Sequence, residues 1–210
     1  MPAPLPPLPP VFAVTDDDVR VPGCSMVDLL ADDHDQLDAL GRRLRDAVSR
    51  TDPAATGVAD VLVATLTRHL SAEEQYLYPC VRAVLPDGGP LADHELAEDA
   101  AMLSTLKRLH GTAADHPGYP GLVETITRQV SRHARRATAE LFPYLRERCT
   151  DNELVRLGNR VEIARAAAPT RPHPATPLTP PVNKVIDPAI GVVDKVRDLL
   201  GRRRTRPEDL

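Results

Sequence analysis

Residues that could bind a metal lie at the centre of several stretches with helical hydrophobic periodicity. They are His34, His69 with Glu73, Asp99 and His133. A charge or an imidazole inside an apolar core costs free energy unless it is paired or bound. One histidine in an apolar stripe is usually a hydrogen-bonded core residue. Four stretches with this feature at similar depth favour a shared metal site.

His69 and Glu73 have the most informative spacing. They are four residues apart, so in a helix both side chains leave the same face one turn apart. One helix can then supply both an imidazole and a carboxylate to the same ion. The alternative is a surface ion pair. Because Leu62, Leu66 and Leu77 share that face, we predict that the pair points inward.

The elements that must position these residues are helices. Apolar residues recur three and four apart in four long stretches separated by short connections, and Ser25 is a suitable N-cap for the first. This pattern predicts an all-α fold, an antiparallel up-down four-helix bundle with a short fifth helix. The stretches are 27–48, 58–84, 96–110 and 122–144, with the fifth helix at 152–167.

The second and fourth stretches have the same spacing between a histidine and a proline. His69 lies ten residues before Pro79, and His133 lies ten residues before Pro143. A proline inside a helix costs about 3 kcal/mol or kinks it. The matched prolines predict matched kinks in two helical hairpins related by a pseudo-two-fold axis, with their polar residues facing one central point.

Proline-rich segments delimit the domain. We predict a Pro-rich tail at 1–24, the bundle at 25–168, a Pro-rich linker at 169–181 and a basic amphipathic segment at 182–210. The last segment could contact a membrane surface or a protein partner. The alternative is a tail helix that packs back on the bundle or stays disordered.

Several runs of residues resemble the hemerythrin-like HHE cation-binding family, and its actinobacterial branch in particular. These runs are His69 to Pro79 (HLSAEEQYLYP), Leu85 to Gly88, Ala92 to Ala97 (ADHELA), His133 to Pro143, and the Thr170 to Pro174 tract that follows the domain. The resemblance covers about 25–200. It implies a non-haem di-iron centre inside a four-helix bundle, with an open position for dioxygen or another small oxidant.

The resemblance also implies ligands, and it has gaps. His34, His69, Glu73 and His133 match ligand positions of the family. Ala137 stands where the family usually has a carboxylate. In the third helix, Asp99 stands where the family usually has a histidine, and Leu103 replaces that histidine's carboxylate companion.

Other residues in the sequence could partly replace the missing ligands. Asp99 is itself a metal-ligand type, and Glu140 lies seven residues after His133, about two turns away on nearly the same face. His94 and Glu98 form another pair four residues apart, but their stripe is less apolar, which favours Asp99 as the inward group. The predicted metal ligands are therefore His34, His69, Glu73, Asp99, His133 and Glu140. This set would suit one iron or manganese ion, whereas two would need more donors or waters.

Composition narrows the function classes. A formal net charge of −4, with no Trp and two Phe, does not favour nucleic acid as a partner.

Cys24, Cys80 and Cys149 form no Cys-x-x-Cys pair, which favours a reducing compartment, and Cys80 is expected to be a packing residue. The N-terminus lacks a signal-peptide pattern and no apolar run is long enough to span a membrane, so we predict a cytoplasmic protein.

Three functional interpretations remain open. The first is a metal protein that handles dioxygen, peroxide, nitric oxide or iron, with a peroxide-consuming activity as one form. The second is a degenerate, metal-free bundle that acts as an interaction or stress-response module. The third is a surface-associated protein that works through its C-terminal segment. No nucleotide loop, nucleophile motif or organic-substrate site is evident in the sequence.

Overall fold

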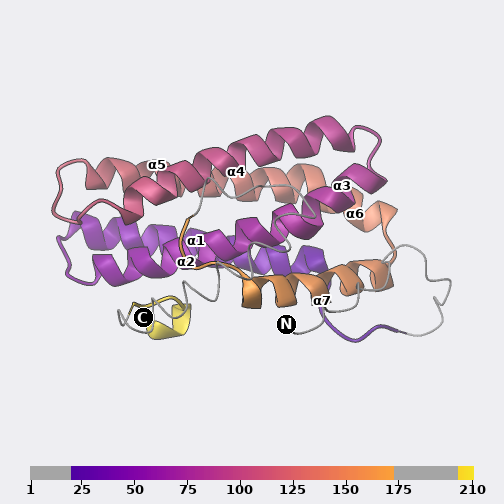
Figure 1. Ribbon diagram of the computed structural model, residues 1–210, viewed down its shortest axis with the longest axis horizontal. Coiled ribbons are helices and arrows are strands. Elements are labelled where there is room, and N and C mark those ends of the chain that lie inside the picture. Colours follow the sequence, from indigo (N-terminus) through magenta and orange to yellow (C-terminus); the bar gives the residue numbers. More distant parts are fainter. Residues whose placement is uncertain (1–19, 173–202) are drawn as a thin grey trace, which may run out of the picture.

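The computed structural model describes residues 20–172 and 203–210, and this part of the chain is helical without any strand (Figure 1). Five helical rods follow one another, and the second and fourth each contain a π-helical turn. The predicted four-helix bundle with a fifth helix is confirmed. The elements are α1 (Met26–Ser49), α2 (Ala55–Ala72), η1 (Glu73–Leu77), α3 (Tyr78–Val84), α4 (Gly88–His110), α5 (Tyr119–Arg136), η2 (Ala137–Leu141), α6 (Phe142–Arg148), α7 (Asp151–Ala167) and η3 (Pro207–Asp209).

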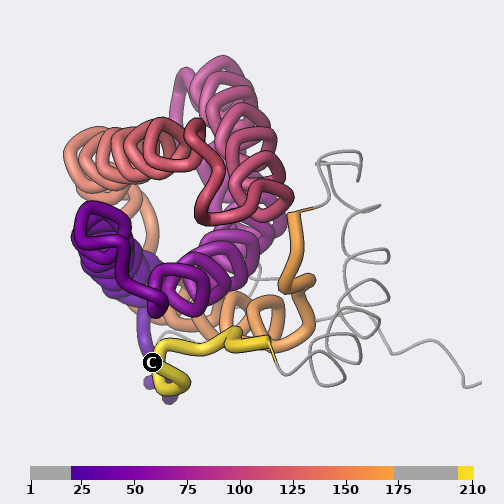
Figure 2. Tube along the Cα trace, turned by 90° about the vertical axis from the view of Figure 1, so that its left-hand side faces the viewer, coloured from indigo at the N-terminus to yellow at the C-terminus, as the bar shows by residue number. Residues whose placement is uncertain are grey.

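The four long rods surround a common axis, as the end-on view in Figure 2 shows. Helix α1 packs against α2 and α5, and α4 packs against α2 and α5, which closes the ring. Helix α7 lies outside the ring against α1 and α2. It therefore covers the side of the bundle to which α1 and α2 belong.

Side-chain caps set the starts of α1 and α7. The Ser25 hydroxyl accepts a hydrogen bond from the Asp28 backbone N–H, as predicted for an N-cap. Thr150 and Glu153 form a capping box at the start of α7. Gly158 lets the chain before α1 approach α7, because a Cβ there would meet the Cys24 carbonyl oxygen at 2.0 Å.

The core consists of two apolar clusters separated by a polar layer. On α1, Leu30 belongs to one cluster and Leu37 to the other, with buried His34 between them. On α5 and η2, Val130 and Ala137 belong to opposite clusters, with His133 between them. The polar residues therefore lie at one level of the bundle, with apolar packing on both sides.

The matched prolines coincide with matched π turns. Pro79 and Pro143 are each the second residue of a short helix, directly after η1 and η2. In each turn a backbone N–H donates to the carbonyl five residues earlier, from Tyr78 to Glu73 and from Phe142 to Ala137. A π turn widens the helix where the proline ring would clash with the carbonyl four residues before it. The predicted helix irregularities therefore occur at equivalent places as π turns.

The last residues of the chain lie against the bundle (Figure 1). The Arg203 guanidinium donates to Asp60 Oδ1 at 2.7 Å and to the Thr170 carbonyl at 2.9 Å. Arg68 donates to the Thr205 carbonyl at 2.7 Å. Residues 1–19 and 173–202, which include most of the predicted tails, linker and amphipathic segment, lie outside the described residues. Among the described helices, none is long and apolar enough to cross a membrane.

Candidate metal centre

Four buried side chains from three of the rods converge in the polar layer. His34 comes from α1, His69 from α2, Glu73 from the first position of η1, and His133 from α5. Each offers one nitrogen or oxygen atom, and these atoms all lie within 4.8 Å of one another. The sequence-predicted core of the site is thus brought together in space.

Glu73 lies at the centre of this group. Its Oε1 is 3.3 Å from His69 Nε2 and 3.8 Å from His34 Nε2, and its Oε2 is 3.1 Å from His133 Nε2. Donor atoms that are each about 2.1 Å from one ion lie about 3 to 4 Å apart. The three distances from Glu73 to the imidazoles lie in this range, as expected for a carboxylate that shares one metal ion with them.

Several of these buried atoms make no hydrogen bond with the described residues. They include both ring nitrogens of His34, Glu73 Oε1 and His133 Nδ1. Leaving a buried polar atom unsatisfied costs about 1–3 kcal/mol, and more if it is charged. A cation among these groups would remove that cost for the atoms that bind it.

The protonation states are set by burial and by mutual charges. Burial, with the neighbouring His69, lowers the pKa of His34 to about 2, which keeps this imidazole neutral. Burial also opposes charge on His69, but Glu73 and Asp33 outweigh it and raise the His69 pKa to about 10. The Glu73 pKa is well below its ordinary value, because His69 and His133 outweigh the effect of burial. The metal-free cluster therefore holds a carboxylate that is balanced by protons on histidines.

Asp99 is buried beside this group, on the far side of the His133 ring. Its Oδ1 is 3.6 Å from His133 Nδ1, and its Oδ2 accepts a hydrogen bond from the Tyr78 hydroxyl at 2.6 Å. Burial raises the Asp99 pKa to about 7. The inward orientation of Asp99 was expected, but its geometry is that of a partner to a ligand. A metal-binding role for Asp99 stays a prediction.

Glu140 is not brought into the cluster. Its side chain is 57% exposed and lies 3.8 Å from the Arg136 guanidinium. The prediction assumed a regular α-helix after His133. The π turn η2 adds about one residue to that path, so Leu141 rather than Glu140 is buried. His94, the alternative ligand, is exposed and contacts Arg136 at 2.6 Å.

A second layer of residues that the sequence reasoning missed holds His69. Asp33 Oδ2 lies 3.0 Å from His69 Nδ1 and 2.5 Å from the Arg165 guanidinium. Arg165 comes from α7 and also donates to the Leu29 carbonyl at 2.8 Å. Such a carboxylate orients a ligating imidazole and increases its basicity. The position of Asp33, directly before His34, was the only available signal.

The two pseudo-equivalent halves of the site differ in chemistry. His133 lies 64 positions after His69, and the same offset relates Glu73 to Ala137 and Tyr78 to Phe142. Tyr78 places its hydroxyl 3.2 Å from Glu73 Oε2, whereas Phe142 stacks on His34 with 5.7 Å between ring centroids. The second half therefore presents a methyl group and a ring where the first presents a carboxylate and a phenol.

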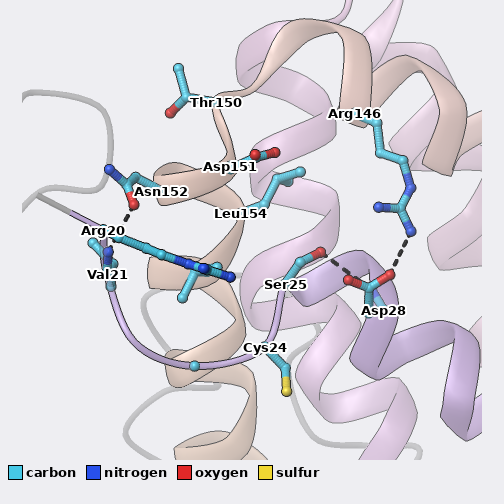
Figure 3. A pocket seen from close by; sticks show the side chains of 12 residues that line it. Arg20, Val21, Cys24, Ser25, Asp28, Arg146, Thr150, Asp151, Asn152 and Leu154 are labelled. Carbon is cyan, nitrogen blue, oxygen red and sulfur yellow. Dashed lines mark hydrogen bonds and ion pairs between the residues drawn. The ribbon is translucent and has the colours of Figure 1, made fainter. Parts of the chain in front are cut away.

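A separate cavity of about 850 Å³ lies where the chain enters α1 and α7 (Figure 3). Arg146 and Asp28 form an ion pair of 2.6 Å at its edge, and the Val21 N–H donates to Asn152 Oδ1 at 2.9 Å. None of the four converging side chains lines it. This cavity is therefore not the metal centre.

Comparisons with known proteins agree with the geometry. The model of the family described as "Hemerythrin HHE cation binding domain" matches residues 25–145. A hemerythrin-like protein of Schizosaccharomyces pombe is 22% identical over 174 residues, which cover 82% of this chain and 85% of the relative. A solved structure of a hemerythrin HHE cation-binding domain-containing protein from Mycobacterium kansasii is 25% identical. It has a TM-score of 0.58 and covers 68% of this chain and 88% of its own.

Proposed function

Because the chain belongs to the hemerythrin HHE cation-binding domain family, we propose that it is a non-haem iron protein that handles a small oxidant. The ligands would be His34, His69, Glu73 and His133. The oxidant class is dioxygen, peroxide or nitric oxide, and manganese is the alternative metal. The observation that carries the proposal is the convergence of four buried donor residues, of which the His34 ring nitrogens and Glu73 Oε1 make no hydrogen bond with any described residue.

One ion per chain is the occupancy that the donor set supports best. Three imidazoles and one carboxylate would leave open positions on a six-coordinate iron. A second ion would need donors where Ala137 and Phe142 now stand. Asp99 is already hydrogen-bonded to Tyr78. The proposed site thus has fewer ligands than the di-iron centre that the family resemblance implies.

Bound iron would supply Lewis acidity and electron transfer to a ligand at an open position. The chain's own residues would set the surroundings. The apolar clusters on both sides would exclude water. Arg165 would hold Asp33, which in turn would orient His69. The Tyr78 pKa is raised well above its ordinary value by burial and by Asp99, so its hydroxyl stays protonated and can donate a hydrogen bond beside Glu73.

Metal analysis of protein from iron-supplemented cells tests this proposal. We expect about one iron per chain, and less than about 0.2 would reject the metal site. Glu73→Gln should lose most of the metal, whereas Glu140→Gln, which changes an exposed carboxylate, should keep it. An equal loss in both variants would contradict the assignment of Glu73.

A metal-free interaction or stress-response module is the alternative, and the missing carboxylate at Ala137 favours it. The same analysis decides between the two functions. A cytoplasmic location and a role in oxidative stress belong to the iron proposal. Cell fractionation and survival of a deletion strain in peroxide would test them.

A further inference from the structure

Two cysteines that are distant in sequence meet inside the protein. Cys80 in α3 and Cys149 at the C-cap of α6 are 2% and 7% exposed, and their sulfur atoms are 3.9 Å apart. Both are free thiols. The contact joins the two short helices that follow the matched π turns, and neither sulfur belongs to the metal cluster.

The pKa values of the two thiols are shifted in opposite directions. The Cys80 thiol shares a hydrogen bond with Cys149, and this contact together with burial raises the Cys80 pKa. The same hydrogen bond lowers the pKa of Cys149, although burial opposes the shift. Cys149 is also the more exposed of the two. Of these two buried thiols, Cys149 is therefore the one more easily converted to a thiolate, which favours it as the first of the pair to react with a small oxidant.

Cys149 lies at the end of α6, just outside regular helix. Cys149 ends α6 with extended dihedral angles, φ −111° and ψ 145°, and only Thr150 separates it from α7. A disulfide needs the sulfurs to lie about 2.05 Å apart, so they must approach by roughly 2 Å. A side chain outside regular helix can contribute to this movement through rotation about its own bonds.

We propose that Cys80 and Cys149 form a dithiol site that hydroperoxides oxidise to an intramolecular disulfide. The Cys149 thiolate attacks one peroxide oxygen, the O–O bond breaks, and the leaving hydroxide takes a proton to become water. Cys80 then attacks the resulting sulfenic acid, the S–S bond forms, and the Cys80 proton leaves with the second water. Two thiols are oxidised and one hydrogen peroxide is reduced to two waters.

The dithiol site does not depend on iron binding. The disulfide would tie α3 to the junction of α6 and α7, and thus link the second and fourth rods. Cys24, the remaining free cysteine, is exposed and provides an internal control.

Peptide mapping of the full-length protein after hydrogen peroxide treatment tests the proposal. The reduced protein is exposed to a small excess of peroxide, alkylated and digested without reductant. We expect the three free thiols to fall to one, with a linked Cys80–Cys149 peptide and an intact Cys24. The Cys24→Ser variant should still form the disulfide. Cys80→Ser should leave a sulfenic acid at Cys149 that dimedone traps, and Cys149→Ser should leave Cys80 reduced.

Other outcomes would overturn the proposal. They are three alkylatable thiols after treatment, a disulfide that involves Cys24, linkage between chains, or a sulfenic acid that forms first at Cys80. Repeating the treatment on protein stripped of metal separates this site from the iron site, because the linked peptide should form in both preparations.

Discussion

Glu73 is a carboxylate buried among three imidazoles, and its charge determines what the cluster can bind. Without an ion, protons on His69 and His133 balance it, and the pKa values of both histidines are raised. A cation competes with those protons for the ring nitrogens that face Glu73.

Metal affinity should therefore increase with pH. His69 has a pKa of about 10 in the folded protein, so at neutral pH a metal that binds its Nε2 must displace a proton. For each proton that the metal displaces, the binding affinity should rise about tenfold per pH unit until the pH reaches that pKa. Competition with a chelator at pH 6.5 and pH 8.0 measures the effect, after correction for the chelator's own titration. An affinity that does not change with pH would contradict the assignment of a proton to His69 in the metal-free protein.

The protons also stabilise the metal-free fold, with the opposite dependence on pH. Because the His69 pKa is raised above 6.5, its contribution is complete below that pH and is lost as pH rises towards about 10. We expect the free energy of unfolding of the metal-free protein to fall between pH 7 and pH 10. Urea denaturation in this range measures it. Glu73→Gln, which removes the charge that holds the protons, should flatten the dependence.

Tyr78 belongs to the first half of the site and connects Glu73 to Asp99. Tyr78→Phe removes the hydroxyl that donates to Asp99 and leaves a buried carboxylate oxygen without a partner. The cost should be about 1–3 kcal/mol in urea denaturation of the metal-free protein. Tyr144→Phe is the matched control because Tyr144 is 53% exposed, and it should change stability little. Equal effects of the two substitutions would mean that the hydrogen bond to Asp99 contributes nothing.

The sequence predicted part of the site at this scale. His34, His69, Glu73 and His133 were identifiable because each interrupts an apolar stripe, and the structure brings them together. Asp33 and Arg165 were missed because each belongs to the polar side of its helix, and their relation to His69 arises only when α7 packs on α1 and α2. Tertiary contacts of this kind leave no periodic signal along the chain.

At the scale of elements, the fold was predictable because long amphipathic helices with short connections have few ways to pack. The helix count and the matched irregularities at Pro79 and Pro143 follow from periodicity and from proline stereochemistry. The π turns were not anticipated, and they account for the misplacement of Glu140. A prediction based on 3.6 residues per turn fails for residues beyond an inserted one.

Helix α7 has a role that its position outside the four-helix ring does not suggest. Arg165 connects it to the cluster through Asp33 and His69. Arg165→Ala should weaken metal binding by about 10- to 100-fold, as loss of an outer partner of a ligand does. Arg156→Ala, a change of equal charge on the same helix, should leave affinity within about twofold. Chelator competition measures both, and equal affinities would confine α7 to packing.

At the scale of the whole molecule, the polar layer lowers the stability of the metal-free bundle, and ion binding would raise it. It separates the two apolar clusters and contains buried atoms that make no hydrogen bond within the described part of the chain. A ligand that binds only the folded state stabilises it by about 4 kcal/mol when present at about 1,000 times its dissociation constant. Thermal unfolding with iron and with chelator should show a higher Tm for the loaded protein. Glu73→Gln should abolish this difference and Glu140→Gln should retain it.

The offset of 64 residues that relates the two halves of the site also has a consequence for protein engineering. Ala137 begins η2 as Glu73 begins η1, and it is buried four residues after His133, as Glu73 is four residues after His69. One codon, changed to give Ala137→Glu, would place a carboxylate at the equivalent point of the second half, and a second change, Phe142→Tyr, would add the phenol. The chain is thus a scaffold on which donors for a second ion can be added one at a time, with nearly all other atoms held constant.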